Sequence, residues 1–191
     1  NKVSGKKVEP VAILNGPAGV GKTSAALAVL QEFGFTVVEV NGSDVNTGDR
    51  LITVLQKNIF SVGLGAKPKK NAVVIDEVDG MYGNEQGDAG DCGAGAFVTY
   101  LTSLKDKRCS PVILIANDMK PKHLRALKAD PTVALRLNFY PIVEHDMQEF
   151  LNNVVRKANS KCSLETLRTV MKSANGDLRA ALTQLQLFVR C

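Results

Sequence analysis

The sequence is poor in residues that bind transition metals. Its four cysteines, Cys92, Cys109, Cys162 and Cys191, are scattered with no pair at C-x-x-C spacing, and the two histidines, His123 and His145, lie far apart. Zinc sites need thiolates and imidazoles gathered in clusters. The sequence therefore gives no support to a zinc site, and we expect reduced thiols in a reducing compartment.

The sequence also lacks long hydrophobic runs. No segment approaches the ~20 apolar residues needed to cross a bilayer, so the sequence excludes a transmembrane protein. The chain does not open with a charged segment followed by an apolar one, which argues against a secretion signal. Asn1 is not an initiator methionine, so we expect the chain to be part of a longer protein.

Charge of either sign is moderate. Charged residues make up 23% of the 191 residues and hydrophobic residues 45%, which is typical of a globular protein rather than a disordered one. The length suits one medium domain, or one domain with a small companion. The net charge of +5 is compatible with a polyanionic partner but too small to demonstrate one.

Short apolar runs rich in β-branched residues alternate with segments of helical spacing. This alternation is typical of a parallel α/β sheet. The pattern predicts five strands, over residues 11–14, 36–40, 72–75, 112–116 and 135–139. It predicts helices over residues 22–33, 49–60 and 96–104. Residues 67–70 read as a basic surface loop, and residues 80–95, which contain six glycines, as a glycine-rich loop.

The pattern changes after Pro141. Apolar residues recur at helical spacing in 147–155, 164–171 and 178–189, with no strand among them. Three amphipathic helices in a row predict a small helical lid domain. We therefore predict two domains, an α/β domain over residues 1–140 and a lid over residues 141–191.

The segment from Gly16 to Thr23, Gly-Pro-Ala-Gly-Val-Gly-Lys-Thr, matches the phosphate-loop pattern G-x-x-x-x-G-K-[ST] in full, between a predicted strand and a predicted helix. Glycines allow backbone N–H groups to surround a phosphate, and Lys22 adds a positive charge. Thr23 is placed to bind Mg²⁺. The alternative is a chance glycine-rich turn. We expect the nucleotide to be bound by Gly16, Pro17, Ala18, Gly19, Val20, Gly21, Lys22, Thr23 and Ser24.

Two adjacent acids, Asp76 and Glu77, end the buried strand Val73-Val-Ile-Asp-Glu77. Burying charge is costly unless it is compensated, and a ligand at the carboxyl end of a parallel strand provides such compensation. Asp76 would complete the Mg²⁺ shell. Side chains alternate along a strand, so Glu77 would point elsewhere and polarise the attacking water. The alternative is a pair of solvated acids.

Two asparagines and an arginine complete the candidate site. Asn117 ends the predicted fourth strand and could orient the hydrolytic water, while Asn41 ends the second. For both, a turn-initiating asparagine is almost as good a reading. Arg179 follows Asp177, which we expect to cap a helix, so the arginine opposes the helix dipole and needs a partner. That partner is either the γ-phosphate or Asp177 itself; we favour the phosphate.

Together these motifs resemble an AAA+ ATPase of the clamp-loader family, most like the large subunit of replication factor C. The resemblance covers nearly the whole chain and is carried by residues 38–44, 75–81 and 175–179. It implies ATP and Mg²⁺ as ligands, a P-loop AAA+ fold, a nuclear location, and ATP hydrolysis that helps load a sliding clamp onto primer–template DNA. It also implies that Asn41 restrains the catalytic Glu77 until DNA is bound.

The resemblance implies partners as well: small clamp-loader subunits in a hetero-oligomer, the clamp and the DNA backbone, with no membrane. The clamp would contact the helix around Phe97, Tyr100, Leu101 and Leu104; the alternative is that these are core residues. The charges that follow, Lys105, Lys107 and Arg108, could touch DNA phosphates, although a solvated charge run is at least as good a reading.

The sequence departs from the family in two places. Small subunits carry a Ser-Arg-Cys motif whose arginine enters the neighbouring ATP site, and Val133 stands where that arginine would be. The loop 82–95 carries Glu85, Asp88 and Asp91 where the family tends to have a basic residue. The competing functions are a nucleotide-gated scaffold that does not hydrolyse ATP, another AAA+ ATPase acting on DNA, and a P-loop kinase. The intact Glu77 argues against the scaffold.

Overall fold

The computed structural model describes residues 9–42, 48–60, 70–80, 90–105, 107, 109–119, 127, 133–160 and 162–189, with only the backbone of 90–94 and 189. The chain divides into two compact units. The first comprises Asn1–Asn15 and Thr23–Asn138, and the second Gly16–Lys22 and Phe139–Cys191. The domain boundary predicted after residue 140 stays a prediction. None of the helices in the described ranges is both long and apolar enough to cross a membrane.

The first unit is built on a five-stranded sheet in the order β2-β3-β4-β1-β5. All its neighbouring strands pair in parallel, as predicted. The strands are β1 (Val11–Asn15), β2 (Phe35–Asn41), β3 (Lys70–Asp76), β4 (Val112–Ala116) and β5 (Ala134–Asn138). The assignment of Lys70 to a loop is wrong, because its backbone pairs with Phe35 and continues the ladder with β2.

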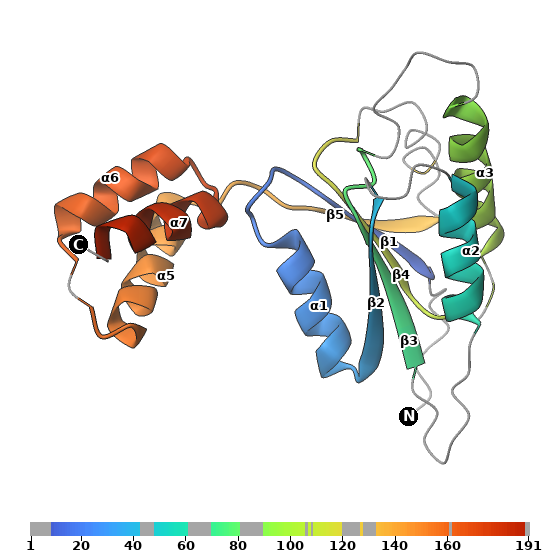
Figure 1. The fold of residues 1–191 in the computed structure, drawn as a ribbon, viewed down its shortest axis with the longest axis horizontal. Helices are drawn as coiled ribbons and strands as arrows, with labels where there is room; N and C mark the ends of the chain where they lie inside the picture. The colour runs from blue at the N-terminus through green and yellow to red at the C-terminus, as the bar shows by residue number, and fades with distance from the viewer. Residues whose placement is uncertain are drawn as a thin grey trace. The chain divides into compact units, whose positions relative to one another are not determined.

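Helices cover both faces of this sheet. α1 (Lys22–Glu32) lies on one face, and α2 (Gly48–Ile59) and α3 (Gly90–Ser103) lie on the other (Figure 1). Right-handed crossovers explain this arrangement, because β1→β2 and β2→β3 run in opposite directions across the sheet. α2 buries one stripe, Leu51, Leu55 and Ile59, against the sheet and α3. The prediction of a parallel α/β fold is therefore confirmed.

α3 begins earlier than predicted. Residues 90–95 were expected to belong to the glycine-rich loop, whereas the helix starts at Gly90. Glycine costs about 1 kcal/mol in a helix interior relative to alanine. Packing of a helix face contributes more to helical stability than propensity does, and the second half of α3 is firmly packed. The remaining part of the predicted loop, 81–89, lies outside the described residues.

The C-terminal half of α3 supplies that packing. Phe97 is 1% exposed, and Leu101 and Leu104 are fully buried within the sheet core. The prediction that these three side chains contact a clamp is wrong, because almost none of their surface is exposed to solvent. Tyr100 is partly buried against the same core. Desolvation, with a smaller contribution from Cys109, raises the pKa of its hydroxyl.

The second unit carries three helices, α5 (Glu144–Lys157), α6 (Leu164–Ala174) and α7 (Leu178–Val189), at the positions predicted for a lid. Their apolar faces share a core that includes Met147, Leu151, Val170 and Leu185. Ser163 caps the N-terminus of α6, and its hydroxyl accepts the Thr166 N–H at 3.0 Å. Asn175 caps the C-terminus in the left-handed conformation, with φ of +47°.

Candidate nucleotide site

The carboxyl ends of two neighbouring parallel strands, β3 and β4, hold residues of the predicted site. β4 lies between β3 and β1, so the residues that follow these strands emerge at one edge of the sheet. Asp76 is the last residue of β3, and Asn117 follows β4. Ligands of open parallel sheets bind at this edge. The topology therefore brings predicted residues from two separate segments to the same edge of the first unit.

Thr23 and Asp76 are in direct contact within the first unit. The Thr23 hydroxyl donates a hydrogen bond of 2.6 Å to Asp76 Oδ2, across 53 positions of sequence. The other carboxylate oxygen, Oδ1, accepts the backbone N–H of Glu77 at 2.8 Å. A hydroxyl and a carboxylate are the hard oxygen donors that Mg²⁺ prefers. The two predicted metal ligands thus lie together, and their chemistry fits the ion.

Glu77 has an unusual backbone conformation. Its φ is +55°, in the left-handed region that non-glycine residues rarely occupy. The turn is held on both sides, because Gly80 N–H donates to the Glu77 carbonyl at 3.0 Å and Val78 N–H donates to Ile115 O at 3.1 Å. The Glu77 side chain is exposed. Strained backbone of this kind clusters at functional sites.

Asn41 lies beside the acidic strand end. The parallel register of β2 and β3 pairs Asn41 with Asp76, the residue before Glu77. This register agrees with an influence of Asn41 on Glu77, although Asn41 is itself exposed. The role remains a prediction.

The turn after β3 contains a residue that the sequence reasoning missed. Asp79 Oδ2 accepts the backbone N–H groups of Asn117 and Asp118, each at 3.1 Å. The signal available in the sequence was a third acid, three positions after Asp76. An acid at this spacing identifies no partner, because the segment that supplies the N–H groups is 38 residues away.

The phosphate loop from Gly16 to Lys22 belongs to the second unit and is shaped by glycine. Gly16, Gly19 and Gly21 have φ values of +154°, +71° and +90°. A Cβ at Gly16 would overlap the Phe139 carbonyl, so the loop needs glycine there for space as well as for conformation. Lys22 is 6% exposed, and its ammonium group donates to Gly16 O at 2.7 Å and to Pro17 O at 2.8 Å. Ser24, the first residue of α1 after Thr23, is exposed.

The start of α7 lies against this loop within the second unit. Leu178 N–H donates to Gly19 O at 3.0 Å, and a Cβ on Gly19 would overlap the Asp177 carboxylate. Asp177 Oδ1 accepts Ala180 N–H at 2.9 Å, so the predicted cap of α7 is confirmed. Arg179 lies in the first turn of α7 and is exposed. The sequence indicated the cap but not its contact with Gly19.

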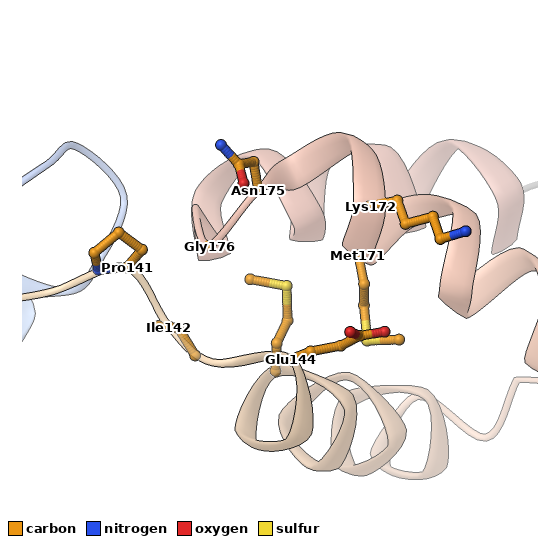
Figure 2. Close-up of a pocket in the computed structure, with 8 residues that line it drawn as sticks. Pro141, Ile142, Glu144, Met171, Lys172, Asn175 and Gly176 are labelled. Atoms are coloured by element: carbon orange, nitrogen blue, oxygen red, sulfur yellow. The ribbon is translucent and has the colours of Figure 1, made fainter.

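A pocket of about 330 Å³ lies in the second unit, between the segment that enters α5 and the end of α6 (Figure 2). Gly176 closes one side, because a Cβ there would approach Pro141 Cβ to 2.6 Å. Ile142 N–H donates to Gly176 O at 3.2 Å. These contacts tie the turn before Asp177 to the chain entering α5. The lining residues are Pro141, Ile142, Glu144, Met147, Met171, Lys172, Asn175 and Gly176.

The chain is similar to proteins of DNA replication. It is 34% identical over 180 residues to the "Replication factor C large subunit" of Pyrobaculum arsenaticum, which covers 93% of this chain and 39% of that protein. The proteins of the same name from Thermofilum pendens and Methanococcus maripaludis are 37% and 31% identical, over 188 and 184 residues. Each match covers 96% of this chain, and 42% and 35% of the relative. The chain thus spans about two fifths of the length of the curated relatives it matches.

The family described as "ATPase family associated with various cellular activities (AAA)" matches residues 12–130. This range contains the phosphate loop, Asp76, Glu77 and Asn117. The resemblance seen in the sequence, to AAA+ ATPases and to the large subunit of replication factor C, is confirmed. Because the match covers more than half of the chain, the chain belongs to the AAA family of ATPases.

Proposed function

We propose that the chain is the ATP-binding and hydrolysing part of a clamp-loader subunit, which helps to load a sliding clamp onto primer–template DNA. The observation that carries the proposal is the hydrogen bond between Thr23 and Asp76. It joins the last residue of the phosphate-loop motif to the acidic end of β3. The similarity to replication factor C large subunits supports the choice of clamp loading among the activities of AAA proteins.

In this proposal the segment Gly16–Ser24 binds the phosphates of ATP. Backbone N–H groups of the loop and the ammonium group of Lys22 compensate the phosphate charge. Thr23 and Asp76 would hold Mg²⁺, which neutralises charge on the β- and γ-phosphates when bound.

Glu77 accepts a proton from the attacking water and so acts as general base. Asn117 orients that water or contacts the γ-phosphate, and Arg179 contacts the γ-phosphate from α7. Asn41, paired in register with Asp76, restrains Glu77 until DNA is bound. In this assignment each of these three polar side chains and Glu77 has one role in hydrolysis.

The partners are inferred from the relatives. We propose a hetero-oligomer with small clamp-loader subunits, because transition-state charge on the γ-phosphoryl group needs a further arginine, worth about 10³–10⁵ in rate in related NTPases. A neighbouring subunit would supply it. Val133, at the position from which small subunits donate theirs, is 2% exposed and belongs to the core. The chain would thus receive such an arginine without donating one from this position.

DNA contact would use Lys105 and Lys107 after α3, of which Lys107 is exposed. Arg108 lies outside the described residues. The nuclear location implied by the sequence resemblance stays a prediction, because the relatives named above come from archaea. The proposed role in the DNA-replication machinery does not depend on a nuclear location.

The test is ATP hydrolysis by the full-length subunit, alone and with small subunits, clamp and primer–template DNA. We expect ATP binding but very slow hydrolysis by the isolated subunit. Hydrolysis should appear with small subunits and DNA, and disappear when the small subunit's Ser-Arg-Cys arginine becomes alanine. Rapid turnover by the monomer, unchanged on dilution, would contradict activation by a neighbour. Binding without hydrolysis in every mixture would support the scaffold alternative.

A different outcome would identify another DNA-dependent AAA+ ATPase. Hydrolysis that DNA stimulates but that neither the clamp nor small subunits alter would favour this alternative. A sliding clamp with its partner-binding surface mutated is the matched control, because it keeps the protein composition of the mixture unchanged.

A further inference from the structure

The turn after β3 holds the end of β4 through one side chain. Asp79 Oδ2 accepts two consecutive backbone N–H groups, those of Asn117 and Asp118, each at 3.1 Å. Hydrogen bonds to an ionised acceptor are stronger than those between neutral groups. The first residues after β4 are therefore fixed by a charge-assisted contact in addition to the ladder between β3 and β4.

Asp79 is itself anchored. Val78, the residue before it, is fully buried and donates its N–H to Ile115 O at 3.1 Å. Gly80 N–H donates to the Glu77 carbonyl at 3.0 Å and closes the turn. The segment from Glu77 to Gly80 thus contacts β4 or its end through both its backbone and its side chains.

Stability alone gives a poor account of this carboxylate. The second oxygen, Oδ1, is buried and has no hydrogen-bond partner among the described residues. A buried carboxylate oxygen is unfavourable unless a hydrogen bond compensates it.

We infer that Asp79 is a positioning residue for ATP hydrolysis, which sets Asn117 relative to Glu77 through the backbone after β4. This inference rests on the proposed function, in which Glu77 and Asn117 both act on the attacking water. Glu77 lies two residues before Asp79, and Asn117 is held by it directly. One turn therefore controls the separation of two groups that come from different strands.

The test is a double-mutant cycle in the full-length subunit, assembled with its partners and DNA. Asp79→Ala should lower kcat by about tenfold or more, as loss of a supporting contact typically does, with the Kd for ATP unchanged. In an Asn117→Ala background, Asp79→Ala should cause no further loss, because the group that it positions is absent. Asp146→Ala is the matched control, since this exposed lid carboxylate contacts only its neighbour His145 among the interactions described.

Each possible result has a distinct meaning. If Asn117→Ala leaves hydrolysis unchanged, the role given to Asn117 in the proposed function fails. If Asn117→Ala lowers kcat but the two losses multiply, Asp79 does not act through Asn117 and this inference fails. A raised Mg²⁺ requirement in Asp79→Ala would identify a metal ligand and would also overturn it.

A conservative variant protects the test against misfolding. Asp79→Asn keeps one oxygen that can accept both N–H groups, so we expect it to retain most of the activity. Amide hydrogen exchange of Asn117 and Asp118 supplies a readout besides activity. It should accelerate in Asp79→Ala and stay slow in Asp79→Asn. Equal loss of activity in both variants, with exchange unchanged, would contradict positioning through these N–H groups.

Discussion

The turn after β3 and the phosphate loop reach unusual backbone conformations by opposite means. In the turn, Glu77 adopts a φ of +55° although it carries a long side chain, and hydrogen bonds on both sides hold it there. In the loop, Gly16, Gly19 and Gly21 adopt positive φ without a side chain to oppose it. The turn is held by backbone hydrogen bonds despite its side chain, whereas the loop reaches its conformation because its glycines have none.

The proposed function gives a reason for this difference. In that function the turn presents a carboxylate, so strain at Glu77 is tolerated for the sake of its side chain. The loop must present N–H groups, and a side chain would only obstruct them. Loss of the Glu77 side chain should therefore lower the rate of hydrolysis, whereas a side chain added at a loop glycine should lower the free energy of unfolding.

Replacement of Glu77 by glutamine should have the largest effect. The amide keeps the shape of the side chain but cannot accept a proton, so we expect kcat to fall by about 10²–10⁴-fold with the Kd for ATP unchanged. The measurement is single-turnover hydrolysis in the assembled complex, beside a fluorescent-nucleotide titration. Hydrolysis at the wild-type rate would show that Glu77 is not the base.

Loss of the loop cation should weaken binding itself. Lys22→Ala removes the ammonium group that donates to Gly16 O and Pro17 O, and with it the charge expected to bind the phosphates. We expect ATP affinity to fall about 10- to 100-fold, as for a hydrogen bond to a charged group. Lys57→Ala, a change of an exposed lysine in α2, is the control. Equal affinity of wild type and Lys22→Ala would refute the phosphate-loop assignment.

The contrast between these segments also explains what could be predicted from the sequence. The phosphate loop was recognisable because its glycines and Lys22 follow a fixed spacing. The five strands were recognisable as apolar runs, although the start of α3 at Gly90 was not, because packing of Phe97 and Leu101 outweighs poor local propensity. That same burial makes the predicted clamp contact through Phe97, Leu101 and Leu104 wrong, whereas a contact through Tyr100 stays a prediction. The contact of Asp79 with Asn117 depends on strand register, which spacing alone does not reveal.

Addition of one methyl group to the loop should damage it through space as well as conformation. Gly19→Ala forces alanine to a φ of +71° and directs its Cβ into the Asp177 carboxylate. Strain of about 1–2 kcal/mol and overpacking of about 1–3 kcal/mol should lower the free energy of unfolding together. Gly34→Ala is the matched control, because Gly34 has a φ of +75° with no atom near its Cβ position.

The two alanine variants separate the contributions by urea denaturation. Gly34→Ala should lose only the free energy of unfolding that the backbone conformation costs. The additional loss in Gly19→Ala should become smaller when Asp177→Ala is added, because the overlapping carboxylate is then absent. If Gly19→Ala were no less stable than Gly34→Ala, the contact between the loop and the start of α7 would be contradicted.

The smallest effect is the most direct test of the strained turn. Glu77→Gly and Glu77→Ala both remove the carboxylate and every interaction it makes, so they differ only in the cost of a φ of +55°. Alanine bears that strain, of order 1–3 kcal/mol, while glycine instead loses about 0.5–1 kcal/mol in backbone entropy. We therefore expect Glu77→Gly to be more stable than Glu77→Ala by about 1 kcal/mol, measured by urea denaturation. Gln31, exposed in α1, supplies the control with the opposite sign, because Gln31→Gly should be less stable than Gln31→Ala by about 1 kcal/mol. If glycine were less stable than alanine at Glu77 as well as at Gln31, the backbone of Glu77 would not be strained. The contrast between the strained turn and the glycine-based loop would then be lost.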